Sequence, residues 1–170
     1  MGRIGFKVSK ESVETISRIS KLPNIKMEGM FTHFAKADEF DKSYTFAQHE
    51  KFLWMKEQLE KNGVQISYYD CDNSAGIIDF PDMKHDLARA GISIYGMYPS
   101  DEVKKDAVDL KPALELISHI SFVKDVEKGT SISYGGTFIT KRDSRIATIP
   151  VGYADGYCRG LSNTGSVLIH

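Results

Sequence analysis

The chain has 170 residues, of which 41% are hydrophobic, with 22 Lys and Arg against 23 Asp and Glu. These values are typical of a globular protein, and the lack of net positive charge argues against a nucleic-acid partner. No apolar run approaches the roughly 20 residues that cross a bilayer, and the amino end lacks a secretory-signal pattern, so we expect a cytoplasmic protein without membrane contact. Cys71 and Cys158 form no CxxC pair, which indicates neither a disulfide framework nor a metal site.

Helical and strand-like patterns alternate over the first hundred residues. Ser9, and either Asp41 or Ser43, are expected to cap the first two helices. The expected elements, in chain order, are helix 9–22, strand 27–35, helix 41–62, strand 64–69, helix 73–80 and strand 87–95. This alternation predicts βαβ units and a parallel sheet, either doubly wound or closed as a barrel.

The pattern changes after Pro99. Apolar side chains fall on alternate positions from Leu114 to Phe122, which is typical of antiparallel β structure. Further strands are expected over 146–151 and 166–170. The second part of the chain is therefore predicted to be all-β.

We place a domain boundary near Ser100, between an α/β domain over residues 1–100 and a β domain over 101–170. A (β/α)₈ barrel takes about 250 residues, so a barrel in this chain would be partial. Both ends of the sequence look cut. The expected fold is thus a partial TIM-like (β/α)₈ barrel followed by the start of an all-β domain.

Two basic side chains stand where packing alone does not require them. Arg3 lies between two glycines in Gly2-Arg3-Ile4-Gly5, which suits bidentate contact with a carboxylate or phosphate, or simply a surface turn. His33 lies at the carboxyl end of a predicted strand, the side where parallel sheets and barrels bind ligands. The alternative for His33 is a hydrogen-bonded core histidine.

Two further clusters suit a phosphate. Asn73-Ser74-Ala75-Gly76 lies at a strand-to-helix turn, where backbone N–H groups, a hydroxyl and the helix dipole attract anions, although an ordinary N-cap looks the same. Arg89 interrupts an apolar strand and must have a partner, either a structural ion pair or a ligand. The adjacent Gly91 would let backbone amides approach a phosphate.

Tyr134 and Tyr153 stand beside glycines in the β-rich part. Such pairs are common in plain β turns, where the ring only packs. The alternative is an acid–base phenol, whose ordinary pKa of about 10 would have to be lowered by neighbouring cations. The candidate cations are Arg89 and His33.

In this order and spacing, the clusters resemble bacterial alanine racemase, a pyridoxal 5′-phosphate (PLP) enzyme with an N-terminal TIM-like barrel and a C-terminal β domain. The stretches that carry the resemblance are MGRIGF, THFAKAD, NSAG, RAGISIYG, SYGGTF and PVGYADGY. The resemblance implies interconversion of L- and D-alanine through a PLP aldimine by a two-base mechanism, supplying D-alanine for peptidoglycan. It also implies a homodimer whose active sites are shared between subunits.

The resemblance implies roles for individual residues. Arg3 would hold the substrate carboxylate and the phenolic oxygen of PLP, and Tyr153 would touch the same carboxylate. Tyr134 would be one of two bases, tuned through His33 by Arg89, which would donate to the pyridine nitrogen. The residues implied to cradle the phosphate are Ser74, Gly91 and Ile92, and those implied to line the access channel are Asp38 and Arg159.

The sequence departs from the family pattern in two places. The family's Schiff-base lysine, which is also the second base, lies before the position of Arg3, and no lysine here stands in a matching motif. We therefore expect the chain alone to be inactive, as the central part of an active parent enzyme. Asp70 stands where the family usually has a histidine. The alternatives are a racemase for another small amino acid, such as serine, and a non-catalytic PLP-binding remnant.

Overall fold

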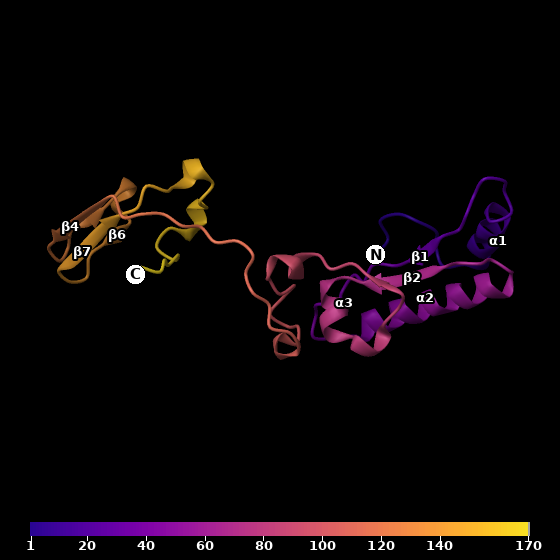
Figure 1. Cartoon of the computed structure of the whole chain (residues 1–170). Coiled ribbons are helices and arrows are strands. Elements are labelled where there is room, and N and C mark those ends of the chain that lie inside the picture. Colours follow the sequence, from indigo (N-terminus) through magenta and orange to yellow (C-terminus); the bar gives the residue numbers. More distant parts are fainter. Residues whose placement is uncertain (170) are drawn as a thin grey trace. The chain divides into compact units, whose positions relative to one another are not determined.

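The computed structural model describes residues 1–169 and divides into two compact units, Met1–Leu114 and Glu115–His170 (Figure 1). Val103 is buried in the core of the first unit, so the chain just beyond Ser100 packs with the residues before it. The end of the barrel domain near Ser100 stays a prediction. None of the helices over residues 1–169 has the length and apolar character needed to cross a membrane.

A three-stranded parallel sheet organises the first unit. Its strands are β1 (Gly29–Phe31), β2 (Tyr68–Asp72) and β3 (Leu87–Ala88), in the order β1-β2-β3. The α-helices are α1 (Lys10–Ile19), α2 (Ser43–Lys61) and α3 (Ser74–Asp79), and three 3₁₀ turns cover Pro81–Met83, Ile92–Tyr95 and Lys105–Ala107. Parallel strands joined through helices confirm the predicted βαβ organisation.

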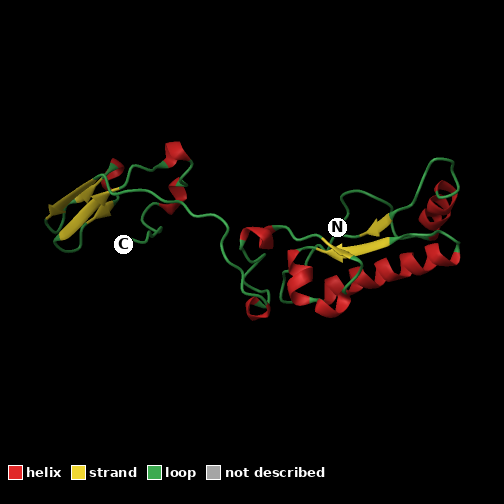
Figure 2. Ribbon diagram, in the orientation of Figure 1, coloured by secondary structure: helices red, strands yellow, loops and turns green. Residues whose placement is uncertain are grey.

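The core lies between the sheet and its helices (Figure 2). Because side chains alternate along a strand, Tyr69 and Cys71 of β2 face α2 and are buried with Phe52. Phe31, which pairs with Asp70 in the register, projects from the opposite face and is 61% exposed. The sheet therefore has one face covered by helices, and a second face that carries Phe31 together with Asp70.

The helix ends follow local signals in the sequence. The Ser9 side chain accepts a hydrogen bond from the Ser12 N–H at 3.1 Å, which confirms the predicted N-cap. Gly63, at φ +74°, ends α2 as expected. The N-cap position of α2 is Lys42, whose side chain makes no cap bond, but the Asp41 carboxylate accepts from the Ser43 N–H at 2.9 Å. The prediction that Asp41 caps this helix end is therefore confirmed, with Asp41 one residue before the N-cap position.

The strands of the first unit are shorter than predicted. The expected strand 87–95 ends at Ala88, because the backbone turns at Gly91 (φ −116°, ψ −103°) into the 3₁₀ turn Ile92–Tyr95. The expected strand 27–35 shrinks to β1, and the strand expected over 64–69 shifts to β2. A strand exists only where a neighbour supplies the ladder hydrogen bonds, which the apolar pattern does not encode.

The second unit is antiparallel, as predicted. β4 (Phe122–Val126) pairs with β7 (Ser144–Thr148), and β5 (Ser131–Ile132) pairs with β6 (Phe138–Ile139). Of the strand expected from Leu114 to Phe122, only Phe122 lies in a strand, as the first residue of β4, and Leu114 is exposed. Residues 166–169 also form no strand, so that prediction was wrong over this range, while His170 lies outside the described residues.

Candidate active site

The carboxyl ends of the three parallel strands bring together the clusters predicted in the first unit. His33 lies two residues beyond β1, Ser74 two residues beyond β2, and Arg89 directly follows β3. Since parallel strands end at the same edge of a sheet, residues far apart in the sequence become neighbours there. This is the edge at which parallel α/β proteins bind ligands.

Arg89 is the centre of a polar network at this edge. Its guanidinium forms an ion pair with the buried Asp70 carboxylate. It also donates to the Thr32 carbonyl oxygen at 3.0 Å and to His33 Nδ1 at 3.2 Å, and it lies over the Phe31 ring at 4.9 Å from the centroid. The partner that the sequence required for Arg89 is therefore a structural ion pair with Asp70.

Burial and positive charge favour the neutral form of His33. Desolvation lowers the pKa of His33, and the charges of Arg89 and Arg3 lower it further. Burial and the Arg3 charge also lower the pKa of Arg89. Because a guanidinium only donates hydrogen bonds, His33 Nδ1 must accept, which puts the ring proton on Nε2. Arg3 itself is exposed, but its charge reaches both groups.

Three donors converge on the Ser74 hydroxyl oxygen next to this network. The Gly91 N–H lies 2.9 Å from it, the Ser93 N–H 3.2 Å and the Ser93 hydroxyl 3.0 Å. The 3₁₀ turn that begins at Ile92 aims these donors at one point. A side chain at position 91 would place its Cβ 3.7 Å from the same oxygen and would fill this space.

These residues fit PLP. Converging N–H and hydroxyl donors match the oxygens of a phosphate. Arg89 has five N–H donors, and its contacts with Asp70, Thr32 and His33 use three of them over the described residues. The others remain for an acceptor such as a ring nitrogen.

The sequence reasoning missed two members of this site. Asp70 was noted only as a departure from the family, although alternation along β2 places it on the face of Phe31 and Arg89. Asp72, two residues on, has Oδ1 buried without a hydrogen-bond partner within residues 1–169, and burial raises its pKa. The alternation along the strand could have indicated both carboxylates.

The remaining predicted site residues are Asp38 in the first unit and Tyr134, Tyr153 and Arg159 in the second. Asp38 is half-buried, and its carbonyl oxygen accepts from the Ser100 hydroxyl at 2.6 Å. In the second unit, Tyr134 is 90% exposed, and the Arg159 guanidinium lies 5.8 Å from the centroid of the exposed Tyr153 ring. The contacts expected between these side chains and the first unit stay predictions.

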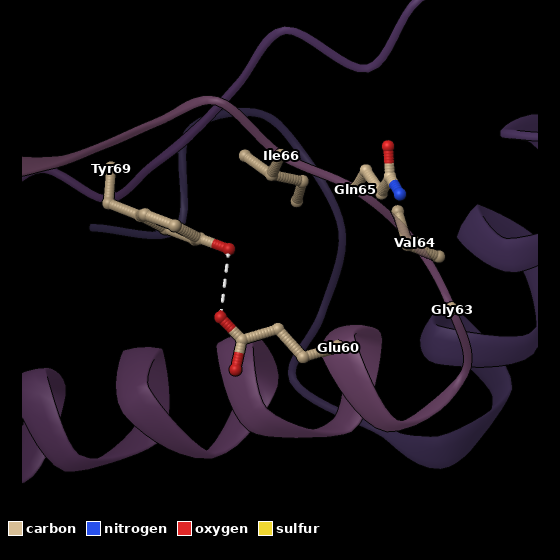
Figure 3. Close-up of a pocket in the computed structure, with 6 residues that line it drawn as sticks. All are labelled: Glu60, Gly63, Val64, Gln65, Ile66 and Tyr69. Atoms are coloured by element: carbon tan, nitrogen blue, oxygen red, sulfur yellow. Dashed lines mark hydrogen bonds between the residues drawn. The ribbon is translucent and has the colours of Figure 1, made fainter.

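A surface hollow elsewhere in the first unit does not match the predicted chemistry. It measures about 370 Å³ and is lined by Glu60, Gly63, Val64, Gln65, Ile66 and Tyr69 (Figure 3). The Tyr69 hydroxyl donates to Glu60 at 3.2 Å, and burial, with the neighbouring carboxylate, raises the pKa of Tyr69. The hollow lies where the chain enters β2, so it is at the amino ends of the strands.

The fold and the site define a class: a parallel α/β protein with an arginine–histidine network and an anion cradle at the carboxyl ends of its strands. The sequence models of two protein domain families match the chain. They are "Alanine racemase, N-terminal domain" over residues 1–99 and "Alanine racemase, C-terminal domain" over residues 113–170. The chain belongs to the alanine racemase family.

Named relatives agree with this assignment. The chain is 52% identical over 169 residues to alanine racemase of Clostridium tetani and 50% identical over 170 residues to that of Methanococcus maripaludis. These matches cover 99% and 100% of the chain but only 44% and 45% of the relatives. The chain thus spans less than half the length of the relatives it matches.

Solved structures show the same relation. Alanine racemase from Clostridium difficile 630 matches with a TM-score of 0.81 at 48% identity, over 94% of this chain and 42% of that one. The enzyme from E. faecalis matches with a TM-score of 0.82 at 36% identity, over 96% and 43%. The predicted fold, part of an α/β barrel followed by the start of an all-β domain, is confirmed.

Proposed function

We propose that this chain supplies the cofactor-binding edge of the barrel, and the start of the β domain, of a PLP-dependent racemase that interconverts L- and D-alanine. The observation that carries the proposal is the Arg89 network beside the cradle at Ser74, Gly91 and Ser93. The names of the relatives favour alanine over serine and favour an enzyme over a non-catalytic remnant.

PLP, when bound, supplies an electron sink for the electron pair left on the substrate Cα after proton removal. Ser74, Gly91 and Ile92 would hold its phosphate, with Ser93 as a further donor. Arg89 would donate an N–H to the ring nitrogen. Because a guanidinium does not readily release its proton, that nitrogen would stay unprotonated, which weakens the sink and restrains side reactions.

The proton transfers would fall to side chains on opposite faces of the substrate Cα. Tyr134 would remove or deliver the proton on one face, with its phenol linked through His33 to Arg89. The neutral state of His33, with its proton on Nε2, supports such a chain because the ring can accept from Arg89 and donate onward. Arg3 and Tyr153 would hold the substrate carboxylate, and Asp38 and Arg159 would line the access channel.

The second base and covalent anchor of the cofactor would be a lysine outside this chain. No lysine here stands in a motif that matches the family's position, which supports this part of the proposal. We further propose a homodimer in which the tyrosines of one subunit complete the site of the other, and a cytoplasmic location. Two free cysteines would agree with a reducing compartment.

The test is a chimera in which residues 1–170 replace the matching segment of the Clostridium tetani enzyme. We expect the chimera to convert L-alanine to D-alanine faster than L-serine to D-serine. Tyr134→Phe should lower kcat by at least about a hundredfold, as loss of a positioned acid–base group does, while Tyr44→Phe, at an exposed position in the first turn of α2 and outside the proposed site residues, should not. A folded chimera that binds PLP but racemises neither amino acid would refute the proposal.

The lysine proposal has a separate test. The chain by itself, incubated with PLP and L-alanine, should form no D-alanine, because one base and the covalent anchor are missing. Formation of D-alanine by the purified chain would show that one of its own lysines serves as the second base and the covalent anchor.

A further inference from the structure

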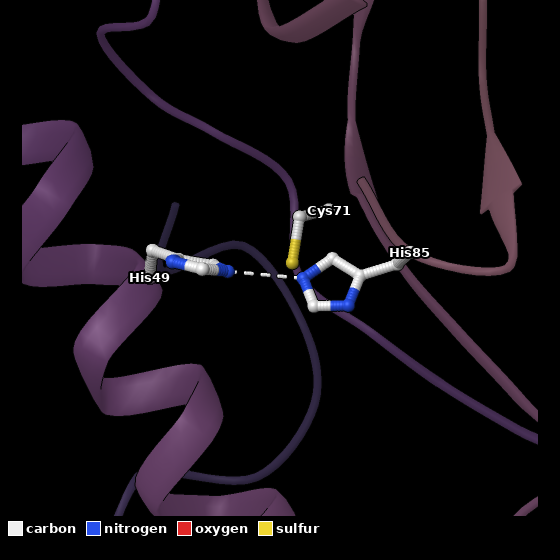
Figure 4. Close-up of side chains that lie close together, drawn as sticks. All are labelled: His49, Cys71 and His85. Carbon is white, nitrogen blue, oxygen red and sulfur yellow. Dashed lines mark hydrogen bonds between the residues drawn. The ribbon is translucent and has the colours of Figure 1, made fainter. Parts of the chain in front are cut away.

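A second cluster of chemically active side chains lies on the other face of the sheet from Arg89. His49 comes from α2, Cys71 from β2 and His85 from the loop before β3 (Figure 4). Cys71 alternates with Asp70 and Asp72, so its thiol faces α2 and not the cradle. The cluster is therefore separate from the proposed racemase site.

The three ligand atoms converge on one point. Nε2 of His49 and Nε2 of His85 are 3.0 Å apart, and a ring nitrogen of each histidine lies within 4.8 Å of Cys71 Sγ. Zinc binds imidazole nitrogen at about 2.0–2.1 Å and thiolate sulfur at about 2.3 Å, so two nitrogens of a tetrahedral site lie about 3.3 Å apart. Small side-chain shifts would bring all three atoms to a single ion.

Packing fixes the two rings in this orientation. The His49 ring stacks against Phe52 with centroids 6.5 Å apart and meets the edge of Phe34 at 6.3 Å. The His85 ring meets the edge of the same Phe52 at 5.2 Å. Aromatic neighbours thus hold two nitrogens toward each other and toward the thiol, which reduces the reorganisation that binding an ion would require.

A hydrogen bond between the two histidines alone does not account for the position of the Cys71 thiol. A hydrogen bond between two neutral rings needs one donor nitrogen and one acceptor nitrogen, and it gives no role to the thiol. Cys71 is fully buried, while both histidines are half-buried, so an ion could enter from their side and keep a water ligand. The charged groups near the rings are Glu50 at His49, and Lys56 and Asp86 at His85.

We propose that His49, Cys71 and His85 bind one Zn²⁺, with water as the fourth ligand, in a site that joins α2 to the sheet. Binding would replace the hydrogen bond between the rings by two metal–nitrogen bonds. The proton on the donor Nε2 would move through solvent to Nδ1 of the same ring, and the thiol proton would be released to solvent. Such ligands suit zinc, since imidazole and thiolate are its preferred donors. The ligands are spread over residues 49 to 85, which is why no metal-binding spacing is visible in the sequence.

The test is titration of the full chain with Co²⁺, followed by displacement with Zn²⁺. We expect one Co²⁺ per chain, a thiolate-to-metal absorption band, and a rise in Tm when Zn²⁺ is added, because a ligand that binds the folded state stabilises it. Cys71→Ser should abolish the band, whereas Cys158→Ser and His119→Gln, which change the exposed thiol and a histidine of the second unit, should leave it intact.

A second variant covers the case in which the buried Cys71→Ser chain does not fold. His85→Gln changes a half-buried position and should weaken Co²⁺ binding by more than about tenfold, since even the loss of an outer partner of a metal ligand costs ten- to a hundredfold. Unchanged binding by His85→Gln, a band that depends on Cys158, or no stoichiometric binding of Co²⁺ and Zn²⁺ would overturn the proposal.

Discussion

The ion pair between Asp70 and Arg89 leads to an asymmetric prediction. The Asp70 side chain is 9% exposed and the Arg89 side chain 38% exposed. Losing one partner of a buried pair costs about 3–5 kcal/mol, because the other charge is left unpaired, whereas exposed pairs contribute only about 0–1 kcal/mol. Which partner is removed therefore matters.

Removing the charge of Asp70 should cost less than removing Arg89. Asp70→Asn leaves the more exposed guanidinium unpaired and keeps an oxygen for the Asp72 N–H, so we expect a loss of about 1–2 kcal/mol. Arg89→Met leaves the buried carboxylate unpaired and also removes the bonds to Thr32 and His33, so we expect about 3 kcal/mol or more.

Urea unfolding followed by fluorescence measures both losses in the first unit alone. Trp54, on α2, is the only tryptophan in the chain, so its emission reports that unit. Lys61→Met is the control, since it breaks an exposed pair with Glu57 on the same helix and should change stability by less than about 0.5 kcal/mol. If Asp70→Asn costs as much as Arg89→Met, the burial argument is wrong.

Three further outcomes follow from buried groups and close packing. Lys42→Met should lower the free energy of unfolding in urea by about 3 kcal/mol, because it leaves the Asp79 carboxylate, whose side chain is 0% exposed, without its cation. Lys51→Met, which changes an exposed lysine of α2, is the control. When the pH falls from about 7.5 to about 5.5, the His33→Gln variant should lose less stability than the unchanged chain. The pKa of His33 is lowered in the folded state, so the imidazole binds a proton more readily in the unfolded chain, where its pKa is about 6.5, and acid favours unfolding. An equal loss of stability in both chains would show that His33 does not contribute to this pH dependence. Gly76→Ala should cost about 1–3 kcal/mol in thermal unfolding, because the new Cβ would lie 2.6 Å from a buried carboxylate oxygen, and a neutral result would show that this oxygen moves freely.

Local features of the fold were predictable because their causes lie within a few residues. The Ser9 cap, the end of α2 at Gly63 and the N-cap of α3 at Asn73 each depend on a side chain or backbone angle next to the helix end. The alternation of helix and strand patterns indicated the parallel sheet, because strands joined through helices form βαβ units. The strand lengths were not predictable, because they depend on partners distant in the sequence.

The motifs in the sequence were sufficient to indicate the family. They also predicted that Arg89, His33, Ser74 and Gly91 belong to a ligand-binding site. Only the tertiary structure decided which groups meet. Parallel β1, β2 and β3 bring their carboxyl ends to one edge, so Asp70 becomes the partner of Arg89. The opposite face of β2 brings Cys71 to two histidines from other elements. Contacts between residues far apart in the chain arise from strand pairing and packing, which a single sequence does not display.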